Sequence, residues 1–331
     1  MEKKELFYGK RRWLIPFFLI GLMLSIFIGD QIATSSDASA SKKVASFSAY
    51  APPPNFFEIQ ENVEVVKNLR YSDTKDAILD IYYPKNQSEN MPVVLWIHGG
   101  GYIGGSKDSR QDYAMTLADG GYVVANINYA LAPEQKYPGP IFQANEAIEF
   151  LMANAAQYGG DMERLFIGGD SAGAQISSQV AAVISNAELA AAMNILPAAN
   201  AEQLKGAVLF CGLYDMDTVR ATQFPNLENF LAAYTGTEVF ESFERIDELS
   251  TVNHITEAYP PVFMTVGDAD PFVSQSEELK EQLLHQNVPV ESLFFEGSNK
   301  QLKHEYQYAL DTEEAQEALK RTLNFLFVNS H

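Results

Sequence analysis

Residues 164–175 read "RLFIGGDSAGAQ" and decide the fold. An apolar run typical of a buried strand leads into small residues that favour a helix. Between them, residues 169–173 (GDSAG) match G-x-S-x-G, a motif in which a serine occupies a sharp turn from strand to helix. The turn leaves no room for side chains two residues either side of Ser171, which explains both glycines. We therefore expect an exposed Ser171 Oγ at a helix N-terminus, where negative charge is stabilised.

On both sides of this segment, from about residue 62 onward, the chain alternates between two patterns. Short apolar, β-branched runs predict eight strands, at residues 63–69, 77–83, 92–97, 122–129, 164–167, 206–211, 261–266 and 290–295. Amphipathic stretches predict helices at 109–118, 141–158, 172–186, 274–286 and 312–328. The first two strands alternate polar and apolar residues, as antiparallel strands do, and most later ones are continuously apolar. This order predicts an α/β fold with a mostly parallel eight-stranded sheet and helices on both faces.

One stretch, residues 213–259, separates two strands by far more than a normal crossover. Phe230, Leu231 and Tyr234 recur at helical spacing within it. We therefore expect a mainly helical insertion that covers the top of the sheet, and not a disordered linker. Functional residues of such sheets gather at the carboxyl ends of the strands.

The histidine and the acid that would activate Ser171 can be sought by their order in the chain. A serine hydroxyl is a poor nucleophile until a base removes its proton, and on this fold the order is serine, acid, histidine. His304 fits, because it follows the last predicted strand, whereas His285 lies inside a predicted helix. Asp268 and Asp270 both follow the strand before it, and spacing alone does not separate them.

The glycine-rich residues 98–104 (HGGGYIG) follow the third predicted strand. Their letters also match the dinucleotide-binding pattern G-x-G-x-x-G. That function needs an acid at the end of the next strand, and the first acid there is Glu134, beyond a proline. An oxyanion instead needs N–H donors without side chains in the way. The consecutive glycines after the third strand provide such donors, and Ala172, the residue after the serine, adds another. We therefore expect this loop to contribute to an oxyanion hole and not to bind a dinucleotide.

Several other polar or reactive residues are expected to be structural. Cys211 is the single cysteine, so no intramolecular disulfide forms, and its apolar run predicts a buried thiol. His98 and Asp170 are expected to anchor the glycine-rich loop. The five histidines lack metal-ligand spacing, so we expect neither a metal nor another cofactor.

Charge and the N-terminal residues bear on partners and location. The net charge of −20, with basic clusters only at the extreme N-terminus, argues against nucleic acid as a partner. Residues 1–45 resemble an export signal: basic residues, the 16-residue apolar stretch 13–28, then a polar linker with Ala38-Ser39-Ala40 as a cleavage site. We expect a cleaved signal peptide or, if uncleaved, a membrane anchor. The domain of residues 46–331 would then be extracellular or held on the outer side of the cytoplasmic membrane.

Three motifs together carry a family resemblance. Residues 98–102 (HGGGY), 129–134 (YALAPE) and 169–173 (GDSAG) resemble the α/β-hydrolase fold, and more narrowly the hormone-sensitive-lipase-like and feruloyl-esterase-like carboxylesterases. The similarity runs over residues 62–328. It implies that a Ser-His-Asp triad cleaves small carboxylic esters through an acyl-enzyme. It also implies that the acid is the aspartate before a proline, which is Asp270. The resemblance further implies that the N–H groups of Gly100, Gly101 and Ala172 form the oxyanion hole.

The chain departs from that family in three places. Ala130 stands where the family has the arginine of Y-R-L-A-P, and Glu305 stands where it has the glycine of H-G-F. N-terminal cap helices are not evident in residues 46–60. These departures leave the substrate open, with a peptidase or amidase on the same fold as the alternative. A non-catalytic binding protein would lack a triad residue, and none is missing.

Overall fold

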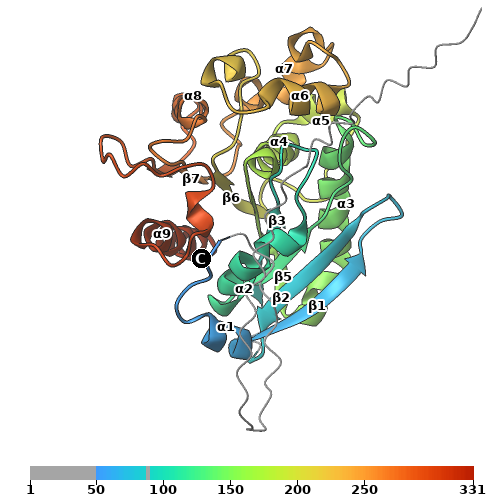
Figure 1. Cartoon of the computed structure of the whole chain (residues 1–331). Helices are drawn as coiled ribbons and strands as arrows, with labels where there is room; N and C mark the ends of the chain where they lie inside the picture. Colours follow the sequence, from blue (N-terminus) through green and yellow to red (C-terminus); the bar gives the residue numbers. More distant parts are fainter. Residues whose placement is uncertain (1–49, 87–89) are drawn as a thin grey trace, which may run out of the picture. The chain divides into compact units, whose positions relative to one another are not determined.

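The computed structural model describes residues 50–86 and 90–331 (Figure 1). The apolar stretch 13–28 and the cleavage site at Ala38-Ser39-Ala40 lie outside the described residues. Within the described ranges, no helix has the length and apolar character needed to cross a membrane.

Eight strands form one sheet in the order β1-β2-β4-β3-β5-β6-β7-β8. The β1–β2 and β2–β4 pairs are antiparallel, and all other pairs are parallel. The predicted mostly parallel sheet is therefore confirmed. The strands are β1 Val63–Arg70, β2 Ile78–Pro84, β3 Met91–Ile97, β4 Val123–Ile127, β5 Gly160–Asp170, β6 Leu204–Phe210, β7 Val262–Thr265 and β8 Val290–Leu293.

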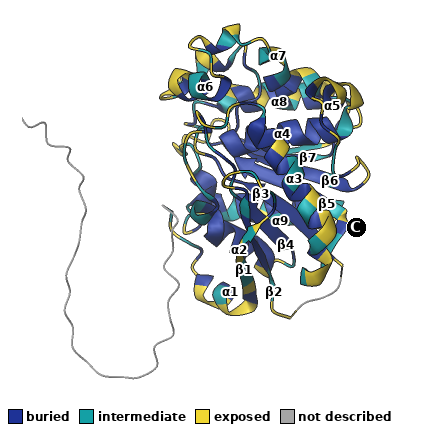
Figure 2. Cartoon of the chain, turned by 90° about the vertical axis from the view of Figure 1, so that its right-hand side faces the viewer, coloured by how far each residue is buried: buried dark blue, intermediate teal, exposed yellow. Residues whose placement is uncertain are grey.

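Helices cover both faces of the sheet (Figure 1). On one face α2 (Gln111–Asp119) lies against α9 (Glu313–Asn329), and the hydroxyl of Tyr113 donates to Thr322 Oγ1 at 3.4 Å. On the other lie α3 (Gly139–Asn154), α4 (Ala172–Ser185) and α8 (Val273–His285). Figure 2 shows the central strands as largely buried, since both faces of a parallel sheet are covered, and β3, β4 and β7 are buried along their whole length. The edge strand β1 keeps exposed positions.

Two helices are missed by the sequence patterns. They are α1 (Phe56–Asn62) and α5 (Ala187–Met193), each of seven residues. Two turns are too short for a helical period to stand out from chance. The helix α1 begins within residues 46–60, where the sequence shows no N-terminal cap helices, and it packs Phe56 and Ile59 into the core.

The insertion of residues 213–259 is helical only in short segments. Its longest helix is α6 (Leu227–Thr235), followed by the single turn α7 (Ile246–Leu249), with one 3-10 turn before α6, one between the two helices and one after α7. Phe230, Leu231 and Tyr234 are buried, as their spacing predicts. The ring of Tyr234 stacks on that of Tyr102 at 3.8 Å between centroids, so the insertion lies against the glycine-rich loop.

Candidate active site

Ser171 occupies the turn between β5 and α4 in a left-handed conformation, with φ 51° and ψ −120°. A Cβ added at Gly169 would lie 2.3 Å from the carbonyl oxygen of Ile97, and one at Gly173 would lie 2.1 Å from it. No side chain fits at such distances, which is the crowding expected from the G-x-S-x-G motif. Ser171 itself keeps 6% of its surface exposed.

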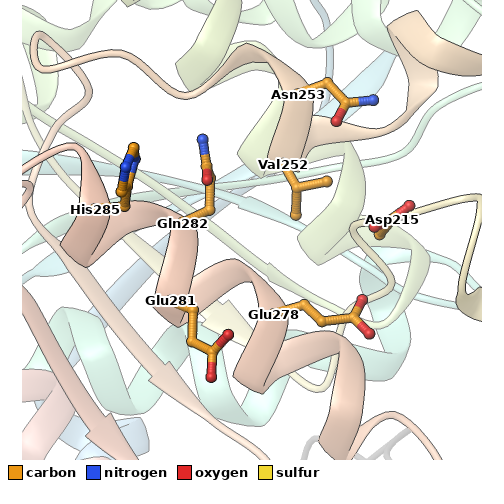
Figure 3. A pocket seen from close by; sticks show the side chains of 7 residues that line it. All are labelled: Asp215, Val252, Asn253, Glu278, Glu281, Gln282 and His285. Carbon is orange, nitrogen blue, oxygen red and sulfur yellow. The ribbon is translucent and has the colours of Figure 1, made fainter.

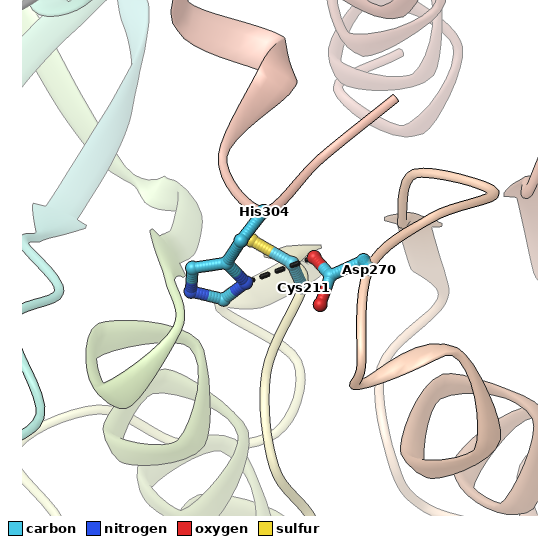
Figure 4. A group of neighbouring side chains, drawn as sticks. All are labelled: Cys211, Asp270 and His304. Atoms are coloured by element: carbon cyan, nitrogen blue, oxygen red, sulfur yellow. Dashed lines mark hydrogen bonds and ion pairs between the residues drawn. The ribbon is translucent and has the colours of Figure 1, made fainter. Parts of the chain in front are cut away.

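His304 and Asp270 come together at the same edge of the sheet (Figure 4). Asp270 lies in the loop after β7, and His304 lies between β8 and α9. The Nδ1 atom of His304 lies 2.8 Å from Asp270 Oδ2, and the N–H of Phe272 donates to Asp270 Oδ1 at 2.9 Å. Nε2 points away from Asp270 (Figure 4), so it is left to face another group.

Asp268, the other acid that spacing left open, holds the loop and not the imidazole. Its carboxylate accepts the N–H of Leu302 at 2.7 Å and that of Gln301 at 3.3 Å. Desolvation works against its charge, but these N–H donors keep the pKa of Asp268 below its ordinary value. The geometry thus separates two carboxylates that lie two residues apart.

Cys211 follows β6 and is fully buried, as its apolar run predicts. Its Sγ, a ring nitrogen of His304 and a carboxylate oxygen of Asp270 lie within 4.8 Å of one another (Figure 4). Burial raises the pKa of the Cys211 thiol to about 11, so it is protonated at neutral pH. Sequence reasoning misses this proximity, because no motif links Cys211 to residues about 60 and 90 positions later.

Opposing influences act on His304. Desolvation by burial lowers its pKa, whereas Cys211 and the hydrogen bond to Asp270 raise it, and the outcome is a pKa well above 6.5. Since the thiol is protonated at neutral pH, the Asp270 carboxylate is the charge that favours the imidazolium. An aspartate in this place also fixes the imidazole tautomer with its proton on Nδ1.

The glycine-rich loop takes left-handed backbone angles at Gly100 and Gly101, with φ of 117° and 59°. A Cβ added at Gly100 would lie 2.2 Å from the carbonyl oxygen of Gly104, so only glycine fits there. Within residues 50–86 and 90–331, no protein acceptor is bonded to the N–H of Gly100 or Gly101. Ala172 is the first residue of α4, so its N–H has no acceptor inside the helix.

Two residues anchor this loop in the way the sequence predicts. The Nδ1 of His98 lies 2.7 Å from the carbonyl oxygen of Gly99, and burial lowers the pKa of His98 to about 4. Asp170 accepts the N–H of Gly99 at 3.0 Å. Asp170 also pairs with Arg110 at 2.7 Å, a buried partner that no sequence pattern indicates.

The insertion contributes the aromatic surroundings of His304. The ring of Phe224 lies edge-on to the imidazole at 4.8 Å and stacks on Phe272 at 4.2 Å between centroids. Phe224 also borders a cavity of about 290 Å³. The other lining residues of that cavity are Arg220, Gln223, Asn226, Leu227, Glu228 and Asn229.

A larger cavity, of about 660 Å³, lies away from these residues, between the insertion and α8 (Figure 3). Asp215, Val252 and Asn253 line it from the insertion, and α8 supplies Glu278, Glu281, Gln282 and His285. None of the candidate catalytic residues lines this cavity. It gives the exposed His285 polar neighbours, but no link to Ser171.

This sheet order, with a serine turn after β5, an acid after β7 and a histidine after β8, defines a protein of the α/β-hydrolase fold. Sequence comparison gives the family. A model of the BD-FAE family matches residues 79–283, more than half of the chain, and the protein belongs to that family.

Curated relatives match over parts of the chain. Carboxylesterase NlhH of Mycobacterium tuberculosis is 36% identical over 116 residues, which cover 35% of this chain and 36% of that protein. Esterase LipC of the same species is 25% identical over 208 residues, 62% of this chain and 51% of that one. The chain therefore spans about a third of the first relative and about half of the second.

Solved structures agree on the fold. Esterase B from Lactobacillus rhamnosis superposes with a TM-score of 0.73 at 24% identity, over 82% of this chain and 87% of that one. A bacterial heroin esterase superposes with a TM-score of 0.66 at 22% identity, over 82% and 86% of the two chains. At these identities the likeness bears on the fold alone.

Proposed function

We propose that this protein hydrolyses carboxylic esters with Ser171, His304 and Asp270 as its catalytic triad. One observation carries the proposal: the 2.8 Å contact of His304 with Asp270, at the sheet edge where Ser171 is held in its strained turn. Strain of this kind persists where the surrounding structure over-determines it, and it is common at active sites.

The proposed reaction has two halves. Ser171 Oγ attacks the ester carbonyl while His304 takes its proton, and Asp270 stabilises the resulting imidazolium. The oxyanion is held by the N–H groups of Gly100, Gly101 and Ala172. His304 then protonates the leaving alcohol, and a water molecule repeats the sequence on the acyl-enzyme to release the acid.

The substrate class is a small-molecule ester. The curated relatives named above are a carboxylesterase and an esterase, and none of the names favours a peptidase or amidase. The cavity beside Phe224 is a candidate subsite for one side of the ester, because Phe224 also contacts the imidazole. Acyl and alcohol preference would then depend on the insertion.

Export is a separate proposal, supported by sequence alone. Basic residues precede the apolar stretch 13–28, and a polar linker follows it, which is the layout of an export signal. The hydrolase domain would then act extracellularly or, if the segment is uncleaved, from the outer side of the cytoplasmic membrane. Fractionation of cells with an antibody to the domain, together with sequencing of the mature N-terminus, tests this proposal.

Labelling with a fluorophosphonate probe tests the catalytic proposal. We expect stoichiometric labelling mapped to Ser171 by mass spectrometry, none in Ser171→Ala, and strongly slowed labelling in His304→Ala. His285→Ala is the matched control, since it removes an exposed imidazole outside the site. Labelling elsewhere, or an unchanged rate in His304→Ala, would contradict the proposal. A panel of p-nitrophenyl esters and anilides then separates an esterase from an amidase.

A further inference from the structure

Arg110 joins three loops that the proposed reaction needs. Its Nε and Nη2 atoms donate to the two carboxylate oxygens of Asp170 at 2.9 and 2.7 Å, and Nη2 also lies 2.9 Å from Glu305 Oε1. Asp170 precedes Ser171 and accepts the N–H of Gly99. Glu305 follows His304. One guanidinium thus bridges the serine turn, the glycine-rich loop and the histidine loop.

Opposing influences act on the Glu305 carboxyl: burial and the nearby Asp170 raise its pKa, whereas Arg110 and His304 lower it, and the pKa stays above its ordinary value. Its side chain is 17% exposed, and the Arg110 side chain is 8% exposed. The hydroxyl of Tyr50 donates to Glu305 Oε2 at 3.2 Å, so both carboxylate oxygens have partners. Such charge-assisted bonds in a poorly solvated place are among the stronger polar contacts in proteins.

The backbone at Glu305 is costly for this residue type. Its φ is +62°, in the left-handed region that favours glycine. Glutamate here bears a steric penalty that glycine would not. The side chain gives a reason for it, since glycine has no carboxylate to pair with Arg110.

The histidine loop is held on both sides of His304. Before it, the N–H of Leu302 is bonded to Asp268 at 2.7 Å. After it, Glu305 is paired with Arg110. With Asp270 on Nδ1, these anchors determine where Nε2 lies relative to the serine turn, to which Arg110 is also attached.

We propose that Glu305 is a positioning residue, which holds His304 in register with Ser171 through Arg110 and Asp170. The inference rests on the proposed triad. Glu305 touches no reacting atom in this scheme. Its contribution is to fix the distance between the loop after β8, which carries His304, and the turn after β5, which carries Ser171.

Two substitutions test the role. Glu305→Gly removes the carboxylate and also relieves the left-handed φ, so it is expected to fold and unfold cooperatively. Glu305→Gln keeps an oxygen acceptor for Arg110 without the charge. Glu296→Gln, an exposed carboxylate in the same loop, is the matched control. The readouts are kcat and KM on p-nitrophenyl acetate, the fluorophosphonate labelling rate, and thermal unfolding followed by circular dichroism.

We expect Glu305→Gly to lose about tenfold in kcat and in labelling rate, with KM within about twofold, because small misplacements of reacting groups slow the chemical step. Glu305→Gln should lie between that variant and the unmodified protein, and Glu296→Gln should match the latter. Activity would then follow the loss of the Glu305 carboxylate and not the change in thermal stability. A purely structural role predicts instead that activity and stability fall together.

Unchanged kcat in Glu305→Gly, or a loss no greater than the loss of folded protein, would overturn the inference while the triad stands. An unmodified protein that neither hydrolyses the ester nor is labelled at Ser171 would overturn the proposed function, and this inference with it.

Discussion

Ser171 and Cys211 end neighbouring parallel strands, β5 and β6, and both have a left-handed backbone, with φ of 51° and 42°. The N–H of Ser171 donates to the carbonyl of Phe210 at 2.8 Å, and that of Cys211 donates to Thr265 at 3.0 Å. Each strand thus ends with one further bond to the next strand before its backbone turns. Both residues are thereby placed at the sheet edge that carries the imidazole of His304.

The thiol of Cys211 is expected to be inert in the folded protein. It is fully buried, and burial raises its pKa to about 11, so little thiolate forms below pH 9. Iodoacetamide at pH 8 should leave it unmodified in the native protein and alkylate it completely in denaturant, as measured by intact mass. Rapid alkylation without unfolding would contradict the burial described here.

The two neighbouring aspartates should respond differently to amide substitution. Asp270→Asn removes the charge that supports His304, and we expect kcat to fall by about 10⁴-fold, as for other triads of this kind. Asp268→Asn is the matched control. It weakens the bond to Leu302 and should lower Tm modestly while most of the activity remains, as measured by ester hydrolysis and thermal unfolding.

If Asp268→Asn were the more damaging substitution for kcat, the assignment of the acid would be reversed. Each variant changes one of the two aspartates and keeps the other, so the two variants can be compared directly.

Activity should rise with pH across a pKa above 6.5. The reaction needs a neutral imidazole. Desolvation lowers the pKa of His304, but the contact with Asp270 outweighs it, and the pKa lies well above 6.5. The acidic limb of kcat/KM is therefore expected above pH 6.5, and Asp270→Asn should move it to lower pH. A limb below pH 6 in the unmodified protein would contradict this expectation.

The raised pKa of His304 affects activity and folding stability in opposite directions as pH rises. A raised pKa means that the folded state binds the proton more tightly than the unfolded state. The stabilisation is fully present below the unfolded-state pKa, near 6.5, and is lost as pH rises through the folded-state pKa. The pH range of higher activity is thus the range in which His304 contributes less to folding.

Alanine substitutions at Gly101 and Gly104 distinguish the loss of an oxyanion donor from a general effect on the glycine-rich loop. Gly101 has φ 59°, and an added Cβ would lie 3.1 Å from the ring of Phe230. Gly101→Ala is therefore expected to lower kcat about 10²-fold by displacing an oxyanion donor. Gly104→Ala is the control, because its Cβ would meet nothing closer than 3.7 Å.

The control should change the free energy of unfolding by less than about 0.5 kcal/mol and leave kcat near that of the unmodified protein. Equal losses in the two variants, measured with p-nitrophenyl acetate, would remove the special role given to Gly101.

The sheet, the serine turn and the choice of His304 follow from local patterns and chain order. Apolar runs predict each strand, and the serine turn needs glycines at two fixed positions. In contrast, Arg110 could not be found from the sequence, because its partners Asp170 and Glu305 are 60 and 195 positions later in the chain. The short helices α1 and α5 were missed because their place depends on packing more than on their own periodicity.

Which of Asp268 and Asp270 contacts His304 could be decided only from the structure, for a similar reason. Both follow β7, and only the path of the loop from β8 to α9 decides which of them meets an imidazole and which meets a backbone N–H. The family resemblance favoured Asp270, but the residues by themselves did not.

The contact of Phe224 with the imidazole of His304 has an evolutionary consequence. The residues proposed to make and break bonds lie in turns and loops that follow strands of the sheet. Phe224, in contrast, belongs to the insertion of residues 213–259. Exchange of that insertion can therefore alter which molecules are accepted without rebuilding the reaction centre. Diversification of this enzyme scaffold, natural or by directed evolution, should concentrate its successful changes there.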